Sequence, residues 1–345
     1  MKRKTRNLLL SLAAIVLLAA MTCGGAGYYL LFYPQFRLTD YTYLYIDNDD
    51  TQDSVICKLN RLSPDAVLTG FQCLAHHRRY AENIHTGRYR INPGDNIYAV
   101  FNRLYRAHQE PIMLTVGGVR TLDMLARNVG RQIMADSAEI ASLMHDSLFL
   151  SSLGYTRQTL PALFMAESYE VYWNISAEAF FKRMQTEHKR FWNAGRLKKA
   201  EEMGLTPDQV CTLASIVAEE TNNAAEKPVV AGLYMNRLKR GIPLQADPTI
   251  KFALQDFGLR RITNAQLQTD SPYNTYLNTG LPPGPIRIPS RTDIEAVLDY
   301  THHNYIYMCA KEDFSGTHNF ASNYTAHMRN ARKYWKALNE RKIYR

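Results

Sequence analysis

A long apolar run near the N-terminus limits, more than any other feature, how this chain can fold. Residues 8–32 contain no charged side chain, and four Lys or Arg residues lie before them. This length matches what a helix needs to cross a bilayer, and the preceding positive charges favour a cytoplasmic N-terminus. We therefore predict a cytoplasmic tail over 1–7, a single transmembrane anchor over 8–33 in the cytoplasmic (inner) membrane, and an extracytoplasmic (periplasmic) remainder.

A cleaved signal peptide is the alternative for the same segment. Leu8–Ala20 has the length of a signal-peptide apolar region, and small residues follow it. The apolar run nevertheless continues through Tyr28–Tyr33. That continuation favours an anchor that is retained.

Composition narrows the partners of the exported part. The chain of 345 residues has a formal net charge of +9, and the tail supplies four of these charges, which leaves +5 for the rest. This surplus suits an anionic polymer or a membrane surface, and no basic stripe with interleaved aromatic residues favours nucleic acid. Five cysteines without a C-x-x-C motif or a zinc-like Cys/His spacing favour neither a metal site nor another cofactor.

Local patterns divide the exported part into two regions and predict an α+β fold. Over 87–106 the sequence predicts a short strand, a turn and a helix, and 111–116 returns as a strand. This pattern indicates a small β-α-β subdomain within 38–118, and a plain packing subdomain is the alternative to a glycan-binding one. Over 119–345 the chain is mostly helical, with a strand predicted over 305–310 and a closing amphipathic helix.

One predicted helix ends in two adjacent acids. Thr206, Pro207 and Gln209 fit a capping box with proline at the first helical position, so the helix starts there. At roughly 100° per residue, Glu220 falls among the apolar directions and Glu219 points to the opposite side. We therefore expect Glu219 to be a solvated surface acid and Glu220 to be buried.

Burial would give Glu220 a carboxyl suited to proton transfer. Apolar surroundings disfavour the charged form and raise the pKa of a carboxyl, as a general acid near neutral pH requires. A shift of about two pH units costs roughly 3 kcal/mol of stability unless a partner offsets it. A structural glutamate bonded to the backbone or to an arginine such as Arg237 is the alternative.

Two downstream segments carry groups suited to sugar recognition. Residues 229–250 predict a helix followed by a compact polar group that includes Gln245 and Asp247. Residues 271–290 form a long loop rich in Tyr, Asn, Pro and Gly, and such loops in compact domains are usually functional. Tyrosine stacks against the CH faces of sugars and asparagine bonds to hydroxyl and acetamido groups, so together the segments predict a groove.

These motifs resemble one known family. Three central segments, in this order and at this separation, look like the endolytic murein transglycosylases, or YceG-like family: "LASIVAEET", "VVAGLYMNRLKRGIPLQADPT" and "YNTYLNTGLPPGPI". Three more segments match other parts of the family: "GRYRINPGDNIYAVFNRL", "LFMAESYEVYWN" and "HNFASNYTAHMRNARKYW". The matches cover most of the chain after residue 85, and the central three are specific.

The resemblance implies a membrane-anchored enzyme that cleaves between N-acetylmuramic acid and N-acetylglucosamine in nascent peptidoglycan strands and leaves a 1,6-anhydro end. It also implies a LysM-like, glycan-binding character for the β-α-β subdomain and association with peptidoglycan synthases. The family's catalytic glutamate directly precedes a threonine, and here these residues are Glu220 and Thr221. The family commonly has another acid two residues earlier; here that position is Ala218, which can do no such chemistry.

A transglycosylase can work with one such acid, whereas a glycosidase that uses water generally needs two carboxylates. Protonated Glu220 would donate to the glycosidic oxygen, and its carboxylate would then take the proton of the substrate's own C6 hydroxyl. Proximity makes this hydroxyl an effective nucleophile. The remaining candidate residues are predicted to contact the substrate. Thr221 and Gln245 would orient or bind the sugars, and the groove would be lined by Asn236, Asp247, Tyr273 and Asn274. The alternative for Asp247 is that it only caps a turn.

Two other functions fit the same residues. A hydrolytic muramidase would use Asp247 as its base and would leave reducing ends in place of anhydro ends. A non-catalytic glycan-binding scaffold would recruit cell-wall synthases through the LysM-like subdomain and the anchor. The function of such a scaffold would survive replacement of Glu220 by glutamine.

Overall fold

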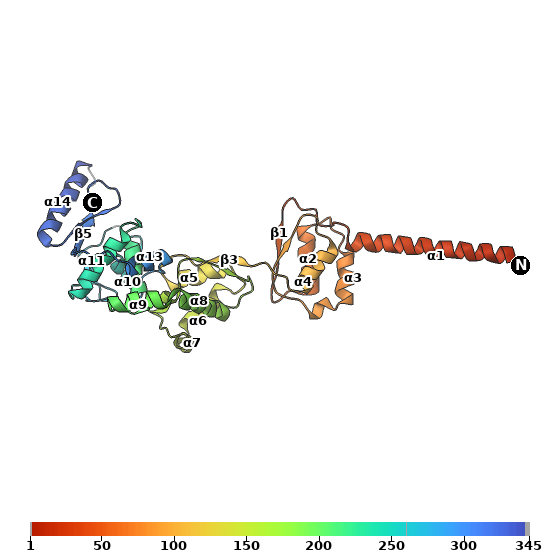
Figure 1. Ribbon diagram of the computed structural model, residues 1–345, viewed down its shortest axis with the longest axis horizontal. Helices are drawn as coiled ribbons and strands as arrows, with labels where there is room; N and C mark the ends of the chain where they lie inside the picture. The colour runs from red at the N-terminus through yellow and green to blue at the C-terminus, as the bar shows by residue number, and fades with distance from the viewer. Residues whose placement is uncertain (1, 260, 342–345) are drawn as a thin grey trace. The chain divides into compact units, whose positions relative to one another are not determined.

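The computed structural model describes residues 2–259 and 261–341 (Figure 1). The chain divides into two compact units. The first comprises the residues up to Met113 together with Glu170–Ile175, and the second comprises Leu114–Tyr169 and the chain from Ser176 onward. Each unit has a hydrophobic core of its own.

Helix α1 (Lys2–Leu31) contains the apolar run of the N-terminus. Its segment Asn7–Leu31 has a mean hydropathy of 2.3 and is long enough and apolar enough to cross a membrane. A signal sequence would meet the same criteria of length and composition, so the helix agrees with both sequence-based interpretations. At its C-terminal end α1 packs on α3 (Thr69–His77), where a Cβ atom at Gly70 would collide with the carbonyl of Leu30.

The first unit is built on an antiparallel pair of strands. Strand β1 (Thr42–Ile46) pairs with β2 (Gly87–Ile91), and the inward side chains Leu44 and Ile46 are buried. The other elements of the unit are α2 (Gln52–Leu62), α3, the 3-10 turn η1 (Tyr80–Glu82) and α4 (Ile97–Tyr105). Phe101 of α4 packs edge-on against Phe71 of α3, with ring centroids 5.4 Å apart, so the helices close the core over the sheet.

The strand that follows α4 does not join this sheet, so the predicted β-α-β unit is wrong. Strand β3 (Ile112–Thr115) pairs with β4 (Ser168–Val171), whereas β2 pairs with β1. An alternating pattern identifies a strand but does not identify its partner, which depends on contacts between distant parts of the chain. The helix between the strands was predicted correctly.

The second unit is mostly helical and confirms the mixed helix-and-sheet class. Its helices are α5 (Leu122–Gly130), α6 (Ser137–His145), α7 (Ser147–Leu153), α8 (Ala177–Phe191), α9 (Ala194–Met203), α10 (Pro207–Glu220), α11 (Lys227–Lys239), α12 (Asp247–Leu254), α13 (Arg291–Leu298) and α14 (Tyr324–Glu340), with 3-10 turns η2 (Leu160–Leu163) and η3 (Gln266–Gln268). Strands β5 (Tyr307–Ala310) and β6 (His318–Ala321) pair antiparallel. The predicted strand over 305–310 and the closing helix are confirmed.

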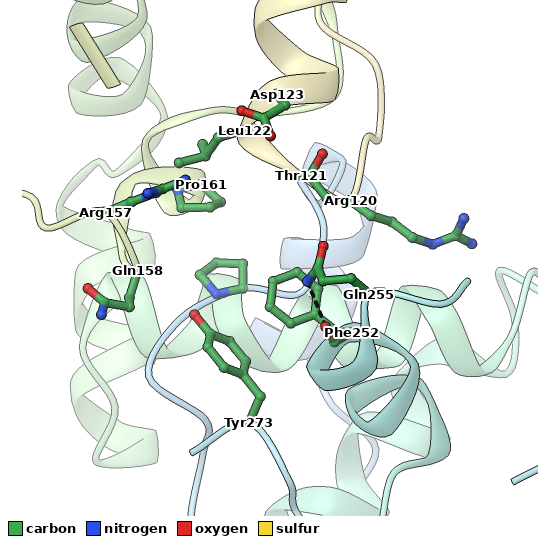
Figure 2. Close-up of a pocket in the computed structure, with 11 residues that line it drawn as sticks. Arg120, Thr121, Leu122, Asp123, Arg157, Gln158, Pro161, Phe252, Gln255 and Tyr273 are labelled. Carbon is green, nitrogen blue, oxygen red and sulfur yellow. Dashed lines mark hydrogen bonds between the residues drawn. The ribbon is translucent and has the colours of Figure 1, made fainter. Parts of the chain in front are cut away.

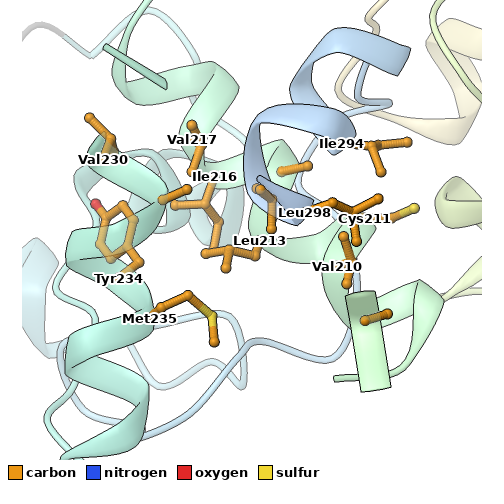
Figure 3. Packing of buried hydrophobic residues seen from close by; sticks show 14 of the residues in the cluster. Val210, Cys211, Leu213, Ile216, Val217, Val230, Tyr234, Met235, Ile294 and Leu298 are labelled. Carbon is orange, nitrogen blue, oxygen red and sulfur yellow. The ribbon is translucent and has the colours of Figure 1, made fainter. Parts of the chain in front are cut away.

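Helix α10 lies within the core of the second unit, where it packs against α9, α11, α12, α13 and η2. Figure 3 shows buried side chains of α10 beside those of α11 and α13. It starts as predicted: the Thr206 hydroxyl accepts from the Gln209 N–H, and the Gln209 side chain accepts from the Thr206 N–H at 2.9 Å. Every residue from Val210 to Ala218 is buried. The helix is therefore covered on all sides, as expected for a helix inside a domain core.

Candidate functional site

Glu220 is the last residue of α10 and lines a cavity of about 340 Å³. Tyr234 of α11 borders the cavity, and the chain at the start of α12 adds Gln245 and Asp247. The rest of the lining includes Tyr276 and residues of β5, β6 and α14. Segments that are distant in the sequence therefore meet around the Glu220 carboxyl.

The surroundings of Glu220 bring its titration close to neutral pH. Burial raises the pKa of Glu220 from 4.5 to about 7, the hydrogen bond from Tyr234 opposes this rise, and the negative charge of Asp247 adds to it. The Tyr234 hydroxyl donates to Glu220 Oε1 at 2.8 Å. Glu220 keeps a partly exposed surface at the cavity. Near neutral pH the carboxyl is thus present in both protonation states, as a group that gives and then takes a proton requires.

Tyr234 is a permanent donor in this pair. The residue is 2% exposed, and burial together with the Glu220 charge raises the pKa of its phenol well above 10. The phenol therefore keeps its proton throughout the range in which Glu220 titrates. Sequence reasoning missed Tyr234; the available signal was a tyrosine among the aliphatic residues of α11, because a buried phenol usually needs a polar partner.

Arg237 does not pair with Glu220, so the alternative of a structural glutamate–arginine pair is wrong. Its guanidinium donates to Pro243 O at 2.8 Å, to Ile306 O at 2.7 Å and to the side-chain oxygen of Gln245. Arginine has only donors, so it binds the Gln245 oxygen and leaves the Gln245 amide N–H groups available for other partners.

Gln245 has a strained backbone and an exposed side chain. Its φ of +54° lies in the left-handed region, which non-glycine residues rarely adopt and which persists only where the surroundings enforce it. Its N–H donates to Thr275 O at 3.0 Å, and the next N–H, of Ala246, donates to the Thr275 hydroxyl at 3.0 Å. These bonds attach the turn before α12 to the loop over 271–290 and hold Gln245 at the cavity.

Asp247 is exposed and lines the same cavity as Glu220. It is the first residue of α12, where the helix dipole favours a carboxylate, and the Tyr276 hydroxyl donates to its Oδ1 at 2.5 Å. Of the residues predicted for the site, the structure therefore brings together Glu220, Gln245 and Asp247.

Two other predicted residues lie outside this cavity. Thr221 is buried at the end of α10, where its hydroxyl accepts from Asn223 N–H at 3.1 Å. Asn236 donates its side-chain amide to His303 O at 2.7 Å and to Tyr305 O at 3.0 Å. Both side chains hold neighbouring backbone in place.

The last two predicted residues belong to the loop over 271–290. Asn274 is fully buried; its amide donates to Leu267 O at 3.0 Å and to Thr269 O at 2.8 Å, and its oxygen accepts from Tyr276 N–H at 2.9 Å. Asn274 therefore fixes the shape of the loop. Tyr273 lines a second cavity rather than the one at Glu220 (Figure 2).

Glu219 is not the solvated acid that the helical phase predicted. Its side chain is 13% exposed, and Arg120 binds both carboxylate oxygens at 2.9 Å. Arg287 adds a contact of 3.2 Å. The loop over 271–290 brings Arg287 to this position, which the sequence of α10 alone does not indicate.

Sequence reasoning also missed the part of the lining that comes from the C-terminal region. Tyr307 of β5, His318 of β6 and His327 of α14 line the cavity. Glu226, just before α11, accepts from the His318 N–H at 2.7 Å and contacts His318 Nδ1 at 2.9 Å, which fixes β6 beside the site. No group of three or more His, Cys, Asp or Glu suited to a metal occurs in the part of the chain that the structure describes.

A carboxyl that titrates near neutral pH in a cavity has the properties of a group that transfers protons. The family model of the YceG-like family matches residues 44–333, and the chain belongs to this family. A crystal structure of a yceG-like protein from Listeria monocytogenes has the same fold, with a TM-score of 0.57 and 22% identity over 85% of this chain and 99% of that one.

Two similar proteins carry the name endolytic murein transglycosylase. The protein of Bacillus subtilis (strain 168) is 37% identical over 133 residues, which are 39% of this chain and 36% of the relative. The protein of Streptococcus pneumoniae serotype 2 (strain D39) is 27% identical over 249 residues, which are 64% of this chain and 45% of the relative. The chain thus spans less than half the length of these curated relatives.

Proposed function

We propose that this chain is an endolytic murein transglycosylase, which cleaves between N-acetylmuramic acid and N-acetylglucosamine within nascent peptidoglycan strands and leaves 1,6-anhydro ends. The observation that carries the proposal is the Glu220 carboxyl, whose pKa lies at about 7 at a cavity of about 340 Å³, a size typical of ligand sites. The names of the Bacillus and Streptococcus relatives support the same activity.

Glu220 would act first as an acid and then as a base. Its proton passes to the glycosidic oxygen as the bond from that oxygen to C1 of N-acetylmuramic acid breaks, and N-acetylglucosamine leaves with a hydroxyl at C4. The Glu220 carboxylate then takes the proton of the C6 hydroxyl while the C6 oxygen forms a bond to C1. Glu220 regains its proton and no water is consumed.

Tyr234 would stabilise Glu220 between these two steps. A hydrogen bond to a carboxylate is stronger than one to a neutral carboxyl group, so the phenol favours the charged form that exists after the first proton transfer. Its own pKa is raised well above 10, so it does not replace Glu220 as the acid. Tyr234 is therefore a positioning residue.

Gln245 would present two N–H donors to the sugar. Arg237 binds its side-chain oxygen, so the group that Gln245 fits is an acceptor such as an acetamido carbonyl. The strained backbone at this position is typical of residues that the surrounding structure holds for function.

A hydrolytic muramidase is the second candidate, because Asp247 lines the same cavity as Glu220. Asp247 would then activate a water molecule. The Tyr276 hydroxyl already donates to Asp247 Oδ1, which leaves one carboxylate oxygen to hold that water. The chemical nature of the new strand ends separates the two reactions.

The proposal places this activity at the outer side of the cytoplasmic membrane. The apolar segment Asn7–Leu31 of α1 would anchor the chain, with the basic residues that precede this segment on the cytoplasmic side. From the family resemblance we also propose a LysM-like glycan-binding role for the first unit and association with peptidoglycan synthases.

Digestion of purified, peptide-free glycan strands tests the function. The full chain in detergent should generate ends that are one water lighter than reducing ends, as mass spectrometry would detect. Glu220→Gln should abolish cleavage, while the matched neighbour Glu219→Gln should retain it, because Glu219 pairs with Arg120 and Arg287 outside the cavity. Reducing ends would favour the muramidase, and intact strands with the unmodified chain would contradict both enzymes.

A further inference from the structure

A second cavity of about 270 Å³ lies in the same unit and shares no lining residue with the cavity at Glu220. It is bordered by the start of α5, the chain before η2, the C-terminal end of α12 and the loop over 271–290. Figure 2 shows Tyr273 beside Phe252, with Arg157, Gln158 and Pro161 on another side of the cavity. The function described above makes no use of this cavity.

The cavity has an aromatic wall. The Tyr273 and Phe252 rings are tilted against each other with centroids 4.7 Å apart, and Tyr273 is partly exposed. Pro161 and Pro285 add further apolar surface. Aromatic faces of this kind stack against the CH groups of sugar rings, and the Tyr273 hydroxyl, which bonds to no other described residue, is available to a sugar hydroxyl.

The rim of the cavity supplies further polar groups. Arg157 and Gln158 are exposed, and their side chains form no hydrogen bond or ion pair with the described residues. Gln255 donates its amide to Phe252 O at 2.6 Å, which leaves its side-chain oxygen as an acceptor. Donors and acceptors beside an apolar wall are what a ring with hydroxyl and acetamido groups requires.

Helix α12 contributes lining residues to both cavities. Asp247 at its start lines the cavity at Glu220, and Phe252 near its end lines the second cavity. At 1.5 Å and about 100° per residue, these positions lie about 7.5 Å apart along the helix axis and about 140° apart around it. Tyr276 and Tyr273 connect the cavities in the same way along the loop, whose shape Asn274 fixes. One helix and one loop therefore supply lining residues to both cavities.

We propose that the second cavity is a non-catalytic subsite that binds a further amino-sugar ring of the same glycan strand. This inference rests on the proposed function, because it takes the strand held at Glu220 as its ligand. Tyr273 provides the stacking surface, and Gln158, Gln255 and Arg157 contact the polar substituents. A strand that occupies both cavities is held at a ring beyond those that flank the cleaved bond.

Binding measurements on the full chain in detergent test the subsite without any need for cleavage. With Glu220→Gln as the background, short and long peptide-free N-acetylglucosamine oligomers are titrated by calorimetry. Tyr273→Leu should weaken binding of long oligomers about tenfold, the effect of losing one stacked ring, and should leave binding of the shortest oligomers unchanged. Gln158→Ala, at an exposed position that folding does not need, should weaken long oligomers in the same direction.

Tyr305→Leu is the matched control, because Tyr305 is 38% exposed, belongs to the same unit and lines neither cavity. Unchanged affinity for long oligomers in both Tyr273→Leu and Gln158→Ala would overturn the proposal. The proposal would also be overturned if these variants lost affinity only for peptide-bearing strands and Arg157→Ala caused the same loss. The ligand of the cavity would then be an acidic peptide. If the unmodified chain cleaves strands but Tyr273→Leu and Gln158→Ala bind long oligomers with unchanged affinity, the subsite alone is refuted. If the unmodified chain binds glycan strands but does not cleave them, the proposed enzymatic function is refuted.

Discussion

Replacement of Tyr234 by phenylalanine should move the pH dependence of cleavage in a defined direction. The Tyr234 hydroxyl donates to Glu220 Oε1 at 2.8 Å, and this bond lowers the pKa of Glu220, which burial has raised to about 7. Tyr234→Phe removes the bond and keeps the buried ring. The pKa of Glu220 should therefore rise further.

The size of this change follows from the strength of the bond. A hydrogen bond to a charged group contributes about 1.5–3 kcal/mol, and one pH unit corresponds to about 1.4 kcal/mol, so the pKa should rise by about 1 to 2. In the proposed mechanism, only protonated Glu220 can start the reaction. The alkaline limb of kcat/KM, at about pH 7 in the unmodified chain, should thus move upward by about 1 to 2 pH units.

The assay is the pH profile of kcat/KM for cleavage of peptide-free glycan strands. Tyr300→Phe is the matched control, because it removes a phenol that accepts from Lys239 at 2.9 Å outside the cavity, and its profile should not move. An alkaline limb that stays in place or moves to lower pH in Tyr234→Phe would refute the assignment of this limb to Glu220.

Three further predictions concern the same part of the molecule. In the unmodified chain, the free energy of unfolding should fall as pH rises from 4.5 to about 7, because Glu220 ionises at lower pH in the unfolded chain than in the folded chain. Glu220→Gln removes this dependence. Thermal unfolding should therefore show the variant gaining up to about 3 kcal/mol relative to the unmodified chain between pH 4 and pH 8. Gln245→Glu keeps an oxygen for Arg237 but removes the N–H donors, so strand-cleavage kinetics should show kcat/KM reduced about tenfold with an unchanged melting temperature. Glu219→Gln should lower the free energy of unfolding by about 1 kcal/mol, measured by denaturant titration, because it breaks the pair with Arg120.

The local signals in the sequence predicted α10 and its terminal acid well. Thr206 and Gln209 form the capping box, and Glu220 has the raised pKa that burial implies. The helical phase was a weaker guide than it first appeared, because α10 is covered on all sides and both acids are largely enclosed. The two acids differ in their partners: arginines form ion pairs with Glu219, and a tyrosine hydroxyl donates a hydrogen bond to Glu220.

The predictions failed where a side chain's role depends on distant backbone. Asn236 and Asn274 have the chemistry of sugar-binding residues, but carbonyl groups of other segments already bind their amides. The pairing of β3 with β4 and the approach of β5, β6 and α14 to the cavity likewise depend on contacts far apart in the chain. Residue type and spacing carry no information about such contacts.

The C-terminal lining of the cavity has a consequence for the order in which the molecule matures. Synthesis proceeds from the N-terminus, so α10 and α11 leave the ribosome well before Tyr307, His318 and His327 are added. During that interval Glu220 lacks part of the enclosure in which a strand would be held. Under the proposed function, we therefore expect a copy that ends before Tyr307 to cleave no glycan strands.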